Sequence, residues 1–120
     1  MSNNDTWTQA LIDLVWSKIP ELEASLIINR GNVIEYKTSK KLKNPSSIKW
    51  LKSISKKISD RFSIHDFDEE LGGLRMTINV FSGNLVITRP IRNNSYLLTL
   101  IMPLTDKVWP FMVTISKIEE

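Results

Sequence analysis

The sequence contains no cysteine, a single histidine and no long apolar run. The lack of cysteine excludes a disulfide framework, a thiolate metal site and a cysteine nucleophile. No apolar stretch approaches the roughly 18 residues that a membrane-spanning helix needs. Asp5, Asp13 and Lys18 interrupt the first twenty residues, so we expect no signal peptide. Together these absences predict a cytoplasmic protein.

What is present is an ordinary globular composition. The chain has 120 residues, of which 42% are hydrophobic and 24% are charged, and its formal net charge is +3. A chain of this length fits one domain. We therefore expect a single domain over residues 1–120, with disorder confined to the ends.

Residues of the kinds that carry catalysis are few and scattered. His65 is followed by an acidic stretch, but the spacing matches neither an EF-hand loop nor a paired-histidine metal motif. Gly72 and Gly73 stand alone and form no phosphate-binding glycine motif. A solvated acidic loop over residues 64–73 is the simpler interpretation. We therefore assign no catalytic, cofactor-binding or metal-ligating residue, expect no cofactor and predict that the protein is not an enzyme.

The first third of the chain predicts a helix and a hairpin. Apolar residues recur at helical spacing over residues 5–19, and Pro20 ends this pattern. Alternating apolar residues predict a strand at 22–29, and Asn29–Asn32 predicts the turn to a returning strand at 33–38. The apolar stripe of the helix consists of Trp7, Leu11, Leu14, Val15 and Ile19.

The rest of the chain predicts a helix, three strands and a final helix. The segments are 46–63, then 74–81, 85–91 and 96–102, then 106–118. The strand at 96–102 is nearly all apolar, which indicates a buried central strand. The element order is therefore α-β-β-α-β-β-β-α, which is an α+β class. The apolar stripe of the middle helix consists of Trp50, Leu51, Ile54, Ile58 and Phe62.

A basic block covers the middle of the chain. Nine of the sixteen Lys and Arg residues fall between Lys37 and Arg61, and only Asp60 opposes them. A solvated helix face is the simplest explanation. A protein partner or an anionic membrane surface is the second, and nucleic acid is disfavoured because no exposed aromatics alternate with the charges. The basic surface predicted on the middle helix consists of Lys49, Lys52, Lys56, Lys57 and Arg61.

All four tryptophans lie in predicted helices, and their positions relative to the apolar stripes predict how far each is buried. Trp7, Trp50 and Trp109 lie on or beside apolar stripes, so we expect each to be in the core or partly covered. Trp16 lies at the edge of its stripe, where an aromatic side chain can also anchor a partner, but we expect it too to be in the core or partly covered.

The element order and three local patterns resemble the roadblock/dynein light-chain-7 family. The patterns are the hairpin at 26–34, the strand-turn-strand formed by 74–80 and 83–87, and the apolar strand at 96–101. This resemblance implies a five-stranded antiparallel sheet flanked by helices, with no active-site residues. It implies a non-catalytic dimeric scaffold that regulates a Ras-like small GTPase or serves in a motor complex.

The resemblance also implies a dimer interface on the middle helix and the third strand. The strand at 74–81 agrees with this, because an apolar edge strand needs a partner. The lysines of the middle helix must point away from a partner helix, which leaves open a homodimer or a heterodimer with a similar domain. We expect Ile78→Asp to split the dimer without unfolding the chain. The implied interface residues are Trp50, Ile54, Ile58, Leu74, Met76, Ile78 and Val80.

Two related folds are the alternatives. A profilin would pair Trp7 with a C-terminal aromatic to bind proline-rich peptides or act on actin, but Trp109 and Phe111 come early in the last helix. A longin-type trafficking domain normally begins with strands, whereas this chain begins with a predicted helix. A basic binder of nucleic acid or membrane is the alternative from a different class.

Overall fold

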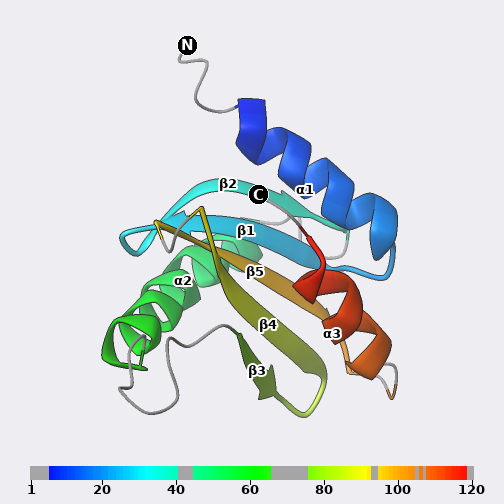
Figure 1. The fold of residues 1–120 in the computed structure, drawn as a ribbon. Coiled ribbons are helices and arrows are strands. Elements are labelled where there is room, and N and C mark those ends of the chain that lie inside the picture. Colours follow the sequence, from blue (N-terminus) through cyan, green and yellow to red (C-terminus); the bar gives the residue numbers. More distant parts are fainter. Residues whose placement is uncertain are drawn as a thin grey trace.

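The computed structural model describes residues 6–40, 45–65, 76–92, 95–104, 106 and 108–118. Its element order is the expected α-β-β-α-β-β-β-α (Figure 1). The observed bounds differ from the expected ones by a few residues at most ends. The elements are α1 (Thr6–Lys18), β1 (Ala24–Asn29), β2 (Asn32–Thr38), α2 (Pro45–His65), β3 (Thr77–Val80), β4 (Asn84–Ile91), β5 (Tyr96–Pro103) and α3 (Val108–Ser116).

The five strands form one antiparallel sheet in the order β2-β1-β5-β4-β3. The centre of the sheet joins distant parts of the chain, because Ala24 of β1 pairs with Ile101 of β5. β5 is therefore the central strand that its apolar sequence predicted. β2 and β3 lie at the two edges (Figure 1).

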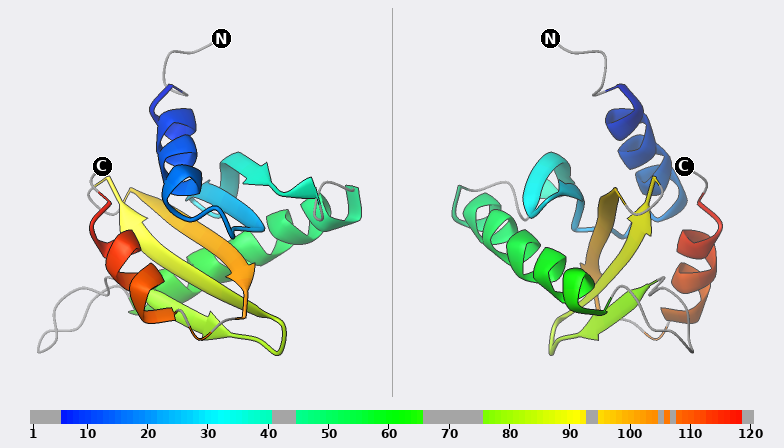
Figure 2. Two further views of the ribbon diagram at one scale, coloured as in Figure 1. Left: turned by 90° about the vertical axis from the view of Figure 1, so that its right-hand side faces the viewer. Right: turned by 60° about the vertical axis from the view of Figure 1, so that its left-hand side comes forward.

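The helices divide between the two faces of the sheet. α1 and α3 cover one face and α2 covers the other, as both views in Figure 2 show. Strand side chains alternate between the two faces, so both faces of β1, β4 and β5 carry buried apolar residues. The core under α1 and α3 includes Leu11, Ile12, Val15, Ile27, Leu85, Ile87, Leu98, Leu100, Phe111 and Ile115.

The core under α2 is smaller. Leu51 and Ile58 of α2 are buried against the sheet, and Ile54 packs against the edge of this cluster. A hydrogen bond between the hydroxyls of Thr88 and Thr99, at 3.0 Å, satisfies two buried polar groups between β4 and β5. The sheet contributes Ala24, Leu26, Ile28, Val86 and Ile101 to this core.

The rotation of α1 differs from the prediction. Leu14 is 41% exposed, whereas Ile12 and Thr8 are buried. Thr8 is accommodated because its hydroxyl donates a hydrogen bond of 3.1 Å to the carboxylate of Glu35 on β2. The buried side of the helix is therefore centred nearer Leu11 and Ile12 than the apolar stripe indicated. No helix among the described residues is long and apolar enough to cross a membrane.

Candidate functional site

β3 leaves one side of the sheet open among the residues that the structure describes. It pairs only with β4, from Thr77 opposite Thr88 to Val80 opposite Leu85. The amide of Phe81 donates to the carbonyl of Asn84 at 2.8 Å, which fixes the alternation of hydrogen-bonded pairs. By that alternation, the backbone N–H and C=O groups of Ile78 and Val80 point away from β4. These groups are available to another strand.

An apolar groove of about 260 Å³ runs beside this edge on the α2 face of the sheet. Its helix side carries Trp50, which is 48% exposed, and Ile54. Its sheet side carries Phe81, which is 51% exposed and directly follows β3. The remaining lining residues are Ser53, Lys57, Ile58, Asn79 and Val86.

The predicted interface residues do not all lie on this side of the sheet. Trp50, Ile54 and Ile58 line the groove. Met76 and Ile78 instead pack against the core beneath α1 and α3, on the opposite face of the sheet. The reason is register, because Ile78 lies opposite Ile87, whose side chain belongs to that core. From this packing we expect Ile78→Asp to destabilise the fold as well, unlike the expectation from the sequence.

Val80 shares the face of Ile78 but is 66% exposed, and Leu74 lies outside the described residues. Asn79 and Phe81 line the groove, yet sequence reasoning did not assign them to the interface. The alternation of side chains along β3 could have identified these two residues, because its odd-numbered residues share the face of the sheet that α2 covers.

The predicted basic surface divides between two sides of α2. Lys49, Lys52, Lys56 and Lys57 are all exposed, but only Lys57 lines the groove. The side chain of Arg61 lies outside the description. Of the four described lysines of α2, three are therefore kept away from the groove.

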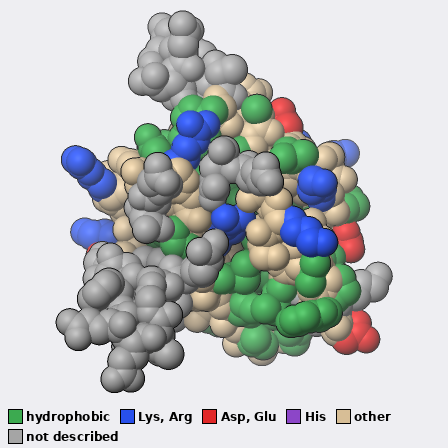
Figure 3. Space-filling view, in the orientation of Figure 1, with side chains coloured by type: hydrophobic (Ala, Val, Ile, Leu, Met, Phe, Trp, Pro, Cys, Tyr) green, Lys and Arg blue, Asp and Glu red, His purple; other side chains and the backbone are tan. Residues whose placement is uncertain are grey.

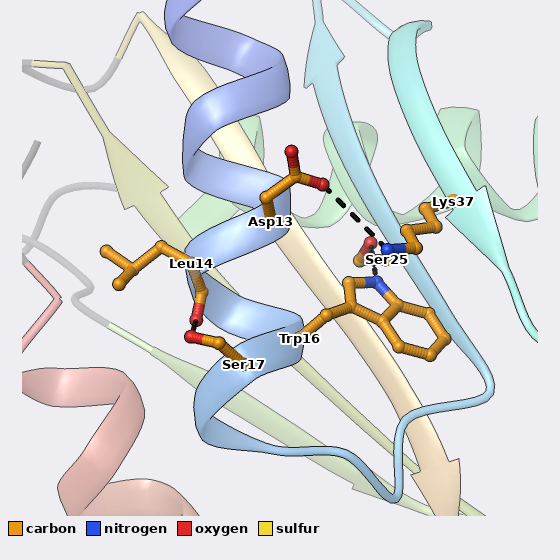
Figure 4. Close-up of polar contacts among 6 residues, drawn as sticks. All are labelled: Asp13, Leu14, Trp16, Ser17, Ser25 and Lys37. Carbon is orange, nitrogen blue, oxygen red and sulfur yellow. Dashed lines mark hydrogen bonds and ion pairs between the residues drawn. The ribbon is translucent and has the colours of Figure 1, made fainter.

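Lys37, the first residue of the basic block, lies on the α1 side of the sheet. Its ammonium group is 3.8 Å from the carboxylate of Asp13 and 5.1 Å from the ring centre of Trp16. The indole N–H of Trp16 donates a 2.7 Å hydrogen bond to the hydroxyl of Ser25 (Figure 4). Trp16 is thus partly buried, as expected, and it links α1 to β1.

Trp109 is exposed, contrary to expectation. It is 70% exposed because it lies about half a turn from the buried Phe111 on α3. Val80 and Leu104 are also exposed, and the amide of Leu104 donates to the carbonyl of Gly83 at 3.1 Å. Figure 3 shows hydrophobic side chains gathered at the lower right, around the β3–β4 hairpin and α3. Exposed apolar groups therefore occur near β3 on both faces of the sheet.

Trp7 does not take the place expected in a profilin. Its ring packs edge-on against Tyr96 of β5 at a centroid distance of 5.0 Å. The guanidinium of Arg92 lies 4.1 Å from the centre of the same ring. The aromatic partner of Trp7 thus comes from the sheet, not from α3.

Within the described ranges, no group of three or more His, Asp or Glu side chains is arranged to hold a metal ion. The side chain of His65, the acidic residues after it and the pair Gly72-Gly73 lie outside the described residues.

Comparisons with known proteins place the fold in a class. No family model matches the sequence, and no curated protein matches it. Among solved structures, a roadblock/LC7 domain from Streptomyces avermitilis aligns with a TM-score of 0.60 and 12% identity, covering 78% of this chain and 76% of that one. The chain therefore has the roadblock fold, as the resemblance implied.

Within that class, the likeness to MglB structures extends further along the chain. The gliding protein MglB from Thermus thermophilus aligns with a TM-score of 0.72 at 11% identity, covering 98% of this chain and 88% of that chain. A structure of MglB with a tetrameric arrangement aligns with a TM-score of 0.71 at 10% identity and the same coverage. The shared architecture includes nearly the whole of this chain.

Proposed function

We propose that this chain is a non-catalytic, dimeric scaffold and regulatory module of the roadblock type, which acts with a Ras-like small GTPase. The observation that carries the proposal is the open edge of β3, flanked by a groove with half-exposed Trp50 and Phe81. Unpaired strand edges and apolar grooves are the features that strand-to-strand association uses. Multimeric neighbours of this fold, such as the tetrameric MglB, also support association.

In the proposed dimer, two β3 strands pair antiparallel about a twofold axis. The outward N–H and C=O groups of Ile78 and Val80 bond to the partner strand. The sheet becomes continuous over ten strands, and both α2 helices lie on one face of it. The groove side of each α2, with Trp50 and Ile54, then approaches the partner. Lys49, Lys52 and Lys56 stay outside the contact, which avoids opposing like charges.

The first test is the solution mass by light scattering, with a matched pair of proline variants. We expect wild type at twice 13.8 kDa. Val80→Pro removes an outward N–H and should give a folded monomer, because the β4 ladder does not use that group. Tyr36→Pro on the β2 edge is the control. The N–H of Ser39 donates to the carbonyl of Glu23 at 2.8 Å, and by the alternation along β2 the N–H of Tyr36 points away from β1. This variant should therefore remove an outward N–H from the other edge and leave the dimer intact.

A second pair of variants tests the groove. Phe81→Ser should weaken dimerisation, whereas Tyr36→Ser removes a comparably exposed aromatic from β2 and should leave it unchanged. A wild-type monomer would contradict the homodimer and direct the search to a heterodimeric partner. A dimer that survives both Val80→Pro and Phe81→Ser would contradict the β3 interface.

The GTPase proposal needs its own measurement. We would titrate purified Ras-like GTPases from the same organism, loaded with GDP or a non-hydrolysable GTP analogue, into the protein by calorimetry. The expected result is binding to one of them that depends on the nucleotide. A lack of binding in both nucleotide states across the set would contradict the GTPase role while leaving the dimer untouched.

A further inference from the structure

We infer that the outward side of α2, together with the tip of the β1–β2 hairpin, is a docking surface for an anionic membrane. The surface, here called the basic face, consists of Arg30, Lys49, Lys52 and Lys56. All four side chains are exposed. The inference goes beyond the proposed dimer, because a single chain already carries the surface.

Contacts between the hairpin and the helix bring these charges together. Arg30 and Gly31 form the turn with positive φ angles of 52° and 83°. A Cβ placed on Gly31 would lie 3.7 Å from Cγ of Lys56, so the turn rests directly on α2. The hydroxyl of Ser55 lies 3.4 Å from the carbonyl of Gly31. Arg30 and Lys56 therefore belong to one continuous surface. Basic side chains project from the left flank in Figure 3, where this hairpin lies in Figure 1.

The basic face is distinct from the groove. Successive residues of a helix are rotated by about 100°, which places Lys49, Lys52 and Lys56 within one sector of α2. Trp50 and Lys57 lie about 80 to 160° further round the helix, on the flank that lines the groove. Dimerisation through the groove would thus leave the basic face open to solvent.

Among the residues that the structure describes, little negative charge compensates the basic face. Asp60 is the only acidic residue of α2, and helical spacing places it in the same sector as the three lysines, four residues after Lys56. The one ion pair found among the described residues, between Lys37 and Asp13, lies on the other side of the sheet. With four cations against the one carboxylate of α2 in the described part of the chain, the basic face attracts anions.

The chemistry favours a lipid surface over a protein or a nucleic acid. Three of the four cations are lysines, which are depleted in protein interfaces and bind phosphate as flexible point charges. The face lies on the outside of a helix, and the groove is on its other flank. Binders of single-stranded nucleic acid add aromatic platforms, and the exposed aromatic among the described side chains of α2, Trp50, faces the groove. Clusters of four to eight basic residues on an amphipathic helix are typical of contacts with anionic lipids.

Dimerisation would double this surface. In a continuous sheet the two α2 helices lie on the same face, so both basic faces point toward one plane. Each lysine close to an anionic membrane raises partitioning roughly fivefold. The doubling of the basic surface rests on the proposed dimer, whereas membrane binding by a single chain does not.

The test is flotation of the full chain with vesicles of phosphatidylcholine, with and without phosphatidylserine. Wild type should float only with phosphatidylserine, and added salt should release it. Lys52→Glu with Lys56→Glu should lower partitioning at least roughly 25-fold. The control is Lys18→Glu with Lys117→Glu, which makes the same change in net charge at exposed positions outside α2. This control should change partitioning by no more than about threefold. Replacing Lys52 and Lys56 by arginine should retain binding.

Three results would overturn the inference: no flotation of wild type, equal losses in both glutamate pairs, or binding of single-stranded RNA or an acidic protein without flotation. The Val80→Pro monomer should still float, but less than the dimer. Failure of dimerisation and failure of membrane binding are therefore separate outcomes.

Discussion

The two edges of the sheet have opposite characters. β2 is engaged by both α1 and α2, and its register shifts between Ile27 and Ile28 of its partner β1. Its charged side chains are also occupied, since Glu35 accepts a hydrogen bond from Thr8 and Lys37 lies over Trp16. β3 is four residues long. Val80 and Phe81 at its end are exposed, and Phe81 lines the groove on the α2 face.

The contrast is the one expected of a sheet that is protected from pairing at one edge and associates through the other, as in the proposed dimer. Charges and an irregular register are means by which edge strands avoid unwanted pairing. β2 has both features, although Ile34 and Tyr36 on it are also half-exposed, whereas β3 (TINV) carries no charge and pairs with β4 in a regular register. In the proposed dimer, association is directed to the β3 edge, and the following predictions test the difference between the two edges.

The largest effect is expected for Ile78→Asp on β3. The side chain packs against the core under α1 and α3, so a carboxylate there should lower the free energy of unfolding by about 3 kcal/mol. Ile34→Asp on β2 is the control, because Ile34 is 42% exposed and should change stability by about 0.5 kcal/mol or less. Urea unfolding followed by circular dichroism measures both, and equal losses would contradict the contrast.

Arg89→Ala should have the next largest effect, in the β3 half of the sheet. One guanidinium nitrogen of Arg89 on β4 donates to the carbonyls of Ile115 and Ile118, at 2.9 and 2.7 Å, which caps the C-terminal end of α3. We expect a loss of about 2 kcal/mol in unfolding free energy. Hydrogen exchange should show the loss first in the last turn of α3, and an unchanged α3 would argue against the capping role.

Ser25→Ala tests the corresponding link in the β2 half. It removes the acceptor of the Trp16 indole, and we expect a loss of about 1 kcal/mol. Trp16→Phe alone should lower the unfolding free energy by a similar amount. The double variant should lose little more than either single variant. An additive double mutant would show that the hydrogen bond contributes nothing.

The smallest effect is expected for Lys37→Ala. Its partner Asp13 and Lys37 itself have side chains that are 61% and 48% exposed, so the ion pair should contribute about 0.5 kcal/mol or less. Thermal unfolding at low and high salt should give nearly the same difference between variant and wild type. A loss of about 2 kcal/mol would mean that β2 depends on this contact far more than surface ion pairs usually allow.

The sequence predicted the elements better than their relative placement. The apolar run along 96–102 correctly indicated the central strand, and the roadblock resemblance correctly implied the five-stranded sheet. Periodicity within a strand says which residues share a face, but not which helix covers that face. Ile78 and Trp50 were therefore assigned to one interface although the sheet separates them. The burial of a tryptophan at the margin of an apolar stripe is equally hard to predict, since Trp109 is exposed whereas Trp16 is partly buried and hydrogen-bonded.

The pairing of β1 with β5 also constrains the order of folding. The β1–β2 hairpin and the β3–β4–β5 meander are local in sequence. The sheet becomes continuous only when β1 pairs with β5, for example Ile28 with Leu97. During synthesis, the apolar strand β1 therefore lacks its central neighbour until most of the chain has left the ribosome. We expect ribosome-bound chains that end before Tyr96 to be sensitive to protease and to depend on chaperones.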